Sequence, residues 1–81
     1  MKLEVRTDKL TELRIKQGLS QTELARGAGI TNGYVSQIEN GLYAPSPKVA
    51  KLIAEVLHTD FDTIFLLKSS QKKLRVSKGG E

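Results

Sequence analysis

Apolar residues recur at intervals of three and four along most of this chain, a pattern that predicts short amphipathic helices. The pattern is clearest at residues 20–41, which read SQTELARGAGITNGYVSQIENG. Ser20 and Glu23 have the spacing of a capping box, in which each side chain binds a backbone N–H of the other residue, so a helix begins here. The apolar face of this helix is formed by Leu24, Ala25 and Ala28.

A tight turn and a second helix follow. Gly29 ends the first helix at a position where the backbone needs a positive φ, which glycine adopts without steric cost. Thr31 can cap the second helix, and the core positions of that helix are Val35 and Ile38. The Asn-Gly pair at residues 40–41 then closes it with another left-handed cap.

These features together favour a helix-turn-helix, whose second helix is free to enter the major groove of DNA. Two helices that cross steeply approach closely, so the small side chain of Ala25 suits their contact. A turn of three or four residues also requires a permissive residue such as Gly29. The alternative is a helical hairpin without any role in binding nucleic acid.

Two further helices flank this motif. The first is capped by Thr7 or Asp8 and runs to about residue 17. The other begins with Ser46 as its N-cap and Pro47 at its first position, where the missing N–H of proline is harmless.

A fifth, short helix completes a predicted all-α domain of five helices. Asp60 can cap it, and its apolar residues are Phe61, Ile64, Phe65 and Leu66. These include both phenylalanines of the chain. The aromatic rings either cover the core or meet a second copy of the chain, and the sequence leaves both alternatives open. In the second case the chain forms a homodimer through this helix, with contacts from Phe61, Phe65 and Leu66.

Charge divides the chain into two parts. Residues 1–67 contain eight basic and eight acidic side chains, whereas residues 68–81 carry the whole net charge of +4. We expect a helix-turn-helix DNA-binding domain over the first part, and a basic tail that is disordered or a short strand over the second. The predicted recognition helix has only one charged residue, Glu39. DNA binding must therefore depend on the motif and on helix N-termini rather than on bulk charge.

The two ends of the chain share a second pattern. Residues 2–6 and 73–77 both alternate apolar and charged positions, as strands do. They could pair as an antiparallel ribbon, within one chain or between two, which would bring Glu4 near Arg75.

The composition excludes several classes of protein. With 81 residues and no cysteine, the chain is one small domain without disulfides or thiolate metal sites. It has no apolar run of membrane-spanning length and no signal-peptide pattern, so we expect a soluble cytoplasmic protein. It has one histidine, no phosphate-binding glycine loop and no cluster of metal ligands. We therefore expect neither an enzyme nor a cofactor.

With the five helices placed, residues 9–66 resemble the Xre/Cro-like helix-turn-helix family, which includes the DNA-binding domains of the lambda and 434 phage repressors. The resemblance is carried by the segments LRIKQGLSQTELARGAGI, YVSQIENG, PSPKVAKLIAEVL and FDTIF. It implies a five-helix domain that binds operator DNA, commonly as a homodimer on a pseudo-palindrome, and controls transcription. The leading hypothesis is a repressor of a phage, mobile element or bacterial operon.

The resemblance also implies a set of site residues. The face turned to the groove comprises Thr31, Asn32, Gly33, Tyr34, Ser36 and Gln37. Contacts to phosphate are expected from Gln21, Thr31, Asn40, Tyr43 and Lys48. Arg14 and Glu39 fall where some family members pair a helix-1 arginine with the glutamate of the turn. The alternative for these two residues is a pair of unrelated surface charges.

The side chains on this face suit the recognition of bases. An Asn or Gln amide can form two hydrogen bonds with adenine, so Asn32 and Gln37 are the best candidates for base contacts. Thr31 and Ser36 can donate to a phosphate or a base edge. Tyr34 can pack on a thymine methyl group or reach a phosphate through its hydroxyl.

The chain departs from the family at three positions. Gly33 stands where a side chain that reads bases is usual, and it offers only close approach. Tyr43 stands where a basic residue often contacts phosphate. His58 stands where a glycine is common after the fourth helix.

A second hypothesis comes from a different functional class. The chain could be an antitoxin that neutralises a toxin partner and also represses its own operon. The tail at residues 68–81 would then fold on the toxin.

Overall fold

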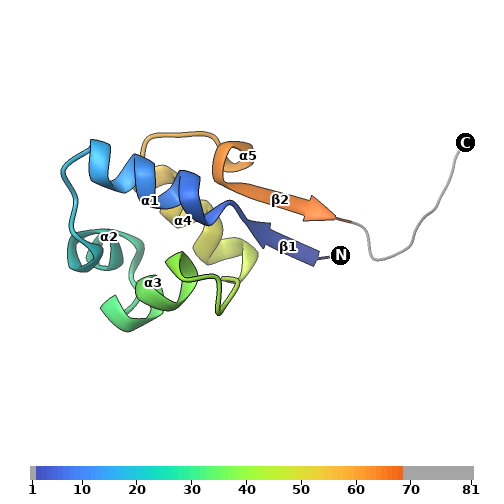
Figure 1. Cartoon of the computed structure of the whole chain (residues 1–81), viewed down its shortest axis with the longest axis horizontal. Coiled ribbons are helices and arrows are strands. Elements are labelled where there is room, and N and C mark those ends of the chain that lie inside the picture. Colours follow the sequence, from blue (N-terminus) through green and yellow to red (C-terminus); the bar gives the residue numbers. More distant parts are fainter. Residues whose placement is uncertain (1, 69–81) are drawn as a thin grey trace, which may run out of the picture.

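The computed structural model describes residues 2–68 and has five helices and two short strands (Figure 1). In chain order these are β1 (Lys2–Val5), α1 (Thr7–Lys16), α2 (Gln21–Ala28), α3 (Asn32–Glu39), α4 (Pro47–Val56), α5 (Phe61–Ile64) and β2 (Phe65–Lys68). The five predicted helices are confirmed, and a small two-stranded sheet is added to them. The longest helices among residues 2–68 have 10 residues each, which is too short to span a bilayer.

One apolar core joins the five helices and the start of β2. Its fully buried large side chains include Leu10 of α1, Leu24 of α2, Ile38 of α3, Ile53 of α4 and Phe65 of β2. Because each helix contributes one apolar stripe to the same core, the helices wrap around it and leave their polar stripes outside.

The predicted caps of the central helices are confirmed. The Ser20 hydroxyl accepts from the Glu23 N–H at 3.0 Å, and the Glu23 carboxylate accepts from the Ser20 N–H at 2.8 Å. Thr31 caps α3 and Ser46 caps α4 in the same manner. His58 has a φ of 53°, which explains why glycine suits this position after α4.

The predicted cap of α1 is wrong. Arg6, rather than Thr7 or Asp8, is the N-cap residue, and its side chain makes no capping hydrogen bond. The Arg6 N–H instead donates to the Ile64 carbonyl at 2.7 Å. The chain therefore passes directly from the strand into the helix, and this tertiary contact fixes the start of α1. Asp60 precedes α5 as predicted, although its side chain makes no capping hydrogen bond.

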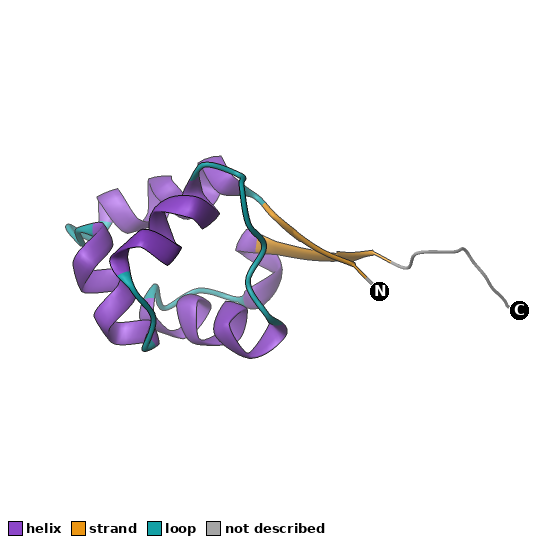
Figure 2. Ribbon diagram, turned by 90° about the horizontal axis from the view of Figure 1, so that it is seen from below, coloured by secondary structure: helices purple, strands orange, loops and turns teal. Residues whose placement is uncertain are grey.

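The last helix is shorter than predicted, because the chain becomes extended at Phe65. Strand β2 pairs antiparallel with β1, in a register that places Val5 opposite Phe65 and Leu3 opposite Leu67. The two strands extend away from the helices as a ribbon (Figure 2). Residues 2–5 thus pair with residues 65–68, which already complete a two-stranded sheet.

Several predictions about the C-terminal end lie outside the described residues. These are the strand at 73–77, the position of Arg75 and the tail beyond Lys68. Glu4 instead forms an ion pair with Lys68, with 3.2 Å between the Lys68 Nζ and the Glu4 Oε1. Lys68 itself belongs to β2.

Candidate nucleic-acid interface

The turn between α2 and α3 fixes the direction of the predicted recognition helix. Gly29 has a φ of 73°, and the N–H of Ile30 donates back to the Ala25 carbonyl at 2.9 Å. Ala25 is buried where α2 packs against its neighbours, as its small size predicts. Val35 and Ile38 anchor one side of α3 in the core, so the opposite side of this helix faces outward.

The outward face of α3 carries most of the predicted base-reading residues. Asn32, Gly33, Gln37 and Asn40 are exposed, and Ser36 is half-buried. The Asn40 amide lies 3.5 Å from the Ser36 hydroxyl, across one turn of the helix. This face, which we call the amide face (Asn32, Gly33, Ser36, Gln37 and Asn40), presents several hydrogen-bonding groups, with both donors and acceptors among them.

Tyr34 differs from the other residues predicted to contact bases, because its ring lies at the border between the amide face and the core. It is half-buried and packs against the core residues. Its other neighbour is Tyr43, and the two ring centroids lie 5.1 Å apart in an edge-to-face arrangement. Tyr43 is 56% exposed, in the loop after α3. The contact between the two tyrosine rings therefore holds this loop against α3 and leaves Tyr43 accessible.

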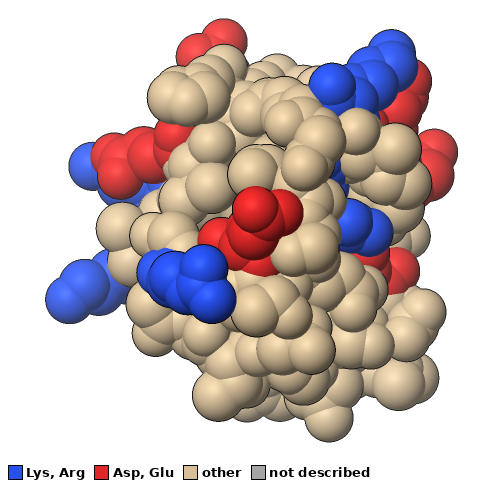
Figure 3. All heavy atoms as spheres, turned by 90° about the vertical axis from the view of Figure 1, so that its left-hand side faces the viewer, with Lys and Arg blue, Asp and Glu red and all other residues tan. Residues whose placement is uncertain are grey.

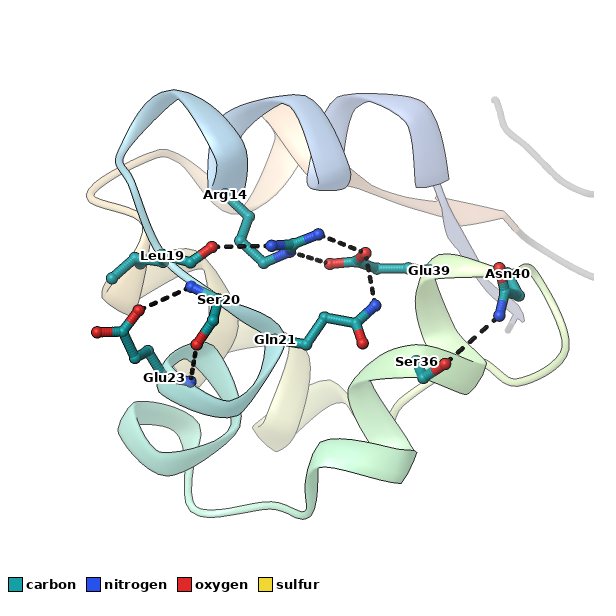
Figure 4. Close-up of polar contacts among 8 residues, drawn as sticks. All are labelled: Arg14, Leu19, Ser20, Gln21, Glu23, Ser36, Glu39 and Asn40. Carbon is teal, nitrogen blue, oxygen red and sulfur yellow. Dashed lines mark hydrogen bonds and ion pairs between the residues drawn. The ribbon is translucent and has the colours of Figure 1, made fainter.

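Arg14 and Glu39 form the predicted ion pair, which links α1 to the end of α3 (Figure 4). The Arg14 Nε donates to Glu39 Oε2 at 2.6 Å, and the Nη2 donates to Oε1 at 3.2 Å. The remaining guanidinium nitrogen, Nη1, donates to the Leu19 carbonyl at 2.8 Å. A two-pronged contact of this kind fixes both side chains in direction as well as in distance.

Gln21 joins the same cluster, which the sequence did not predict. Its Nε2 donates to the Glu39 Oε1 at 3.1 Å. The amide of Gln21, expected from the resemblance to touch a DNA phosphate, is thus held by an interaction inside the protein. The start of α2 and the end of α3 are therefore tied to one carboxylate. The hydrogen bond from Arg14 to the Leu19 carbonyl was also not predicted, because every residue has a backbone carbonyl and the sequence does not show which one accepts.

The environment of Glu39 shifts its titration. The side chains of Arg14 and Glu39 are only 13% and 6% exposed. Burial by itself raises the pKa of Glu39, but hydrogen bonds from Arg14 and Gln21 and the charge of Arg14 outweigh it, so the pKa lies below its ordinary value. The carboxylate is therefore charged at neutral pH, and its charge is balanced by Arg14.

The amide face has little charge of its own. Figure 3 shows one side of the molecule, and its lowest part, where Figure 1 places α3, carries no acidic or basic side chain in that view. The single charged residue of α3, Glu39, is already paired with Arg14. Lys48 is exposed in the first turn of α4, where it remains a predicted phosphate contact. Hydrogen bonding rather than net charge is thus the chemistry that this face offers.

The chain matches known proteins over the region that forms this interface. The family described as Helix-turn-helix (HTH_3) matches residues 10–64. The ImmF control region 10 kDa protein of Bacillus phage phi105 is 36% identical over 55 residues, which cover 68% of this chain and 61% of the phage protein. An uncharacterized HTH-type transcriptional regulator of Bacillus subtilis, YqaF, is 39% identical over 56 residues, covering 69% of this chain and 74% of the relative.

Solved structures share the fold. An HTH_3 family transcriptional regulator from Vibrio cholerae superposes with a TM-score of 0.64 and 30% identity, covering 70% of this chain and 32% of that one. The clp gene regulator ClgR from Corynebacterium glutamicum gives a TM-score of 0.67 at 24% identity, over 70% of this chain and 62% of the other. This second likeness concerns the fold alone.

Proposed function

Given that this chain belongs to the HTH_3 (Xre/Cro-like) family of helix-turn-helix, DNA-binding transcriptional regulators, we propose that it is a repressor that reads the major groove of its operator with α3. The family is regulatory and not enzymatic, in agreement with the sequence prediction. The phage relative is named for a control region, which supports a target in a phage, a mobile element or a bacterial operon. A regulator of such genes acts in the cytoplasm, on the DNA itself.

The observation that carries this proposal is the outward direction of the amide face. Asn32 and Gln37 are exposed, whereas Val35 and Ile38 on the other side of the same helix are buried. Among the described residues, the side-chain amides of Asn32 and Gln37 form no hydrogen bond within the protein. Each can therefore bind an adenine edge through two hydrogen bonds, worth about 1–3 kcal/mol of discrimination per base pair.

The ion pair of Arg14 and Glu39 supports the same function indirectly. It clamps α1 and α2 to the end of α3, so the amide face has a fixed direction relative to the rest of the domain. Residues that read bases must be held in place before binding, because ordering them on the DNA would cost conformational entropy.

We also propose that two copies bind one operator. The exposed apolar side chains Leu66 and Leu67 on β2 are 38% and 48% exposed and could meet a second copy. Phe65 is fully buried and lies 5.1 Å from Phe61 between ring centroids, which favours the core alternative for Phe65. A dimer of this kind would bind half-sites about 34–36 Å apart, or a multiple of that spacing.

Selection of bound duplexes from a random pool tests the proposal. We expect a pseudo-palindrome whose half-sites are one or more helical turns apart, and an affinity that falls as salt is raised. Enrichment of no sequence over the starting pool would contradict the proposal. The antitoxin hypothesis depends on a tail that lies outside the described residues, and no observation on the described part of the chain favours it.

A further inference from the structure

Four of the five glycines in the described part of the chain lie where a side chain is disfavoured. Gly18, Gly29 and Gly41 have backbone φ angles of 72° to 76°, which residues other than glycine rarely adopt. Gly27 lies in α2 against Val56, and an added Cβ would lie 3.0 Å from the Val56 Cγ2. A side chain is therefore disfavoured by the backbone conformation at three of these positions and by the contact with Val56 at the fourth.

Gly33 is the exception. It lies within α3, outside the left-handed region, and an added Cβ would meet no heavy atom within 4 Å. Alanine would fit here without strain and would favour the helix, because glycine loses more conformational freedom on folding. The fold of the described chain thus gains nothing from glycine at this position and is weakened by it.

The place of Gly33 on the helix indicates what uses the open space. It is exposed, lies next to Asn32, and precedes Gln37 by four residues, so it shares a row of the amide face with Gln37. The Gln37 side chain does not cover residue 33, because no heavy atom lies within 4 Å of the position that a Cβ would take there. A bare backbone therefore lies between the two best candidates for base contacts.

We propose that Gly33 is a specificity-determining residue: the edge of a base pair packs against its bare Cα, and the missing side chain sets how closely α3 enters the groove. This inference rests on the proposed function and deepens it. Close approach brings the amides of Asn32 and Gln37 within hydrogen-bonding range of the bases. A methyl group at residue 33 would hold the helix away from the groove, and a larger side chain would hold it farther.

Purified Gly33→Ala and Gly33→Leu proteins test the proposal beside the wild type. The probes are the duplex selected by the wild type and a random-sequence duplex of equal length. We expect Gly33→Ala to raise the Tm by about 2–6 °C. At the selected duplex it should bind about tenfold more weakly, with a larger loss for Gly33→Leu, while affinity for the random duplex changes less than about twofold.

Gly27→Ala is the matched control, since it makes the same change in the neighbouring helix against Val56. It should lower the Tm and leave the affinity of the folded protein for the selected duplex unchanged. If the wild type enriches no duplex, the proposed function fails. If the wild type binds its selected duplex and Gly33→Ala binds it within twofold, or loses affinity equally for both duplexes, the role of Gly33 is refuted and the proposed function stands.

Discussion

The Nε of Arg14 lies 2.6 Å from the Oε2 of Glu39, and through this pair the first helix of the domain holds the end of the third. The contact joins residues 25 positions apart in the chain. Since the carboxylate also accepts from Gln21 at the start of α2, one side chain connects three helices (Figure 4). The direction of the amide face depends on this cluster as well as on the apolar core.

Replacing Arg14 by alanine should destabilise the protein strongly. The change leaves the Glu39 carboxylate buried without its cation and removes the donor to the Leu19 carbonyl. We expect the free energy of unfolding to fall by about 3 kcal/mol, measured by urea denaturation. Lys16→Ala is the control, because Lys16 forms an exposed ion pair with Glu12 whose loss should cost less than about 1 kcal/mol. If the two substitutions lower the free energy of unfolding by the same small amount, the cluster does not stabilise the fold.

The same cluster predicts how stability depends on pH. The pKa of Glu39 is lower in the folded protein than its ordinary value, so the group contributes stability at pH values above that ordinary value. The contribution is lost as the pH falls through the lowered pKa and the carboxylate becomes protonated. We expect the wild type to exceed Glu39→Gln in urea midpoint at pH 7, with a smaller gap at pH 3. A gap that does not change with pH would contradict the assignment.

The contact between Gly27 and Val56 predicts a coupled pair. Gly27→Ala gains helix propensity but forces its methyl group against the stiff, branched side chain of Val56, so we expect a net loss of about 1 kcal/mol in unfolding free energy. In a Val56→Ala background the obstruction is gone, and the same change should become neutral or stabilising. A double-mutant cycle in urea measures this coupling. Additive effects would mean that the two helices simply move apart.

Elements that depend on residues close together in the chain could be predicted from the sequence. The capping box of Ser20, the left-handed Gly29 and the cap at Thr31 are each specified within a few residues, so α2, the turn and α3 could be predicted. The chain after Ile64 could not. Phe61, Ile64 and Phe65 have helical spacing, but pairing with β1, some 60 residues away, draws Phe65 into a strand.

In the candidate site, too, features set by nearby residues could be predicted and features set by distant residues could not. The outward direction of Asn32 and Gln37 follows from the core positions Val35 and Ile38 on the same helix. The edge-to-face contact between Tyr34 and Tyr43 depends on the path of the loop after α3, for which the sequence offers no periodic pattern. Likewise, the contact from Gln21 to Glu39 depends on how two helices cross.

If α3 reads bases through its exposed amides, Gln37→Ala should change how the protein binds the selected duplex and its single base-pair variants, and Lys48→Ala serves for comparison. We expect Gln37→Ala to lose about 1–3 kcal/mol at the selected duplex and to lose discrimination at one base pair of each half-site. Lys48→Ala should weaken binding to all duplexes alike and reduce the salt dependence. If Gln37→Ala keeps the full affinity and the same preference at every position, α3 does not read DNA through Gln37.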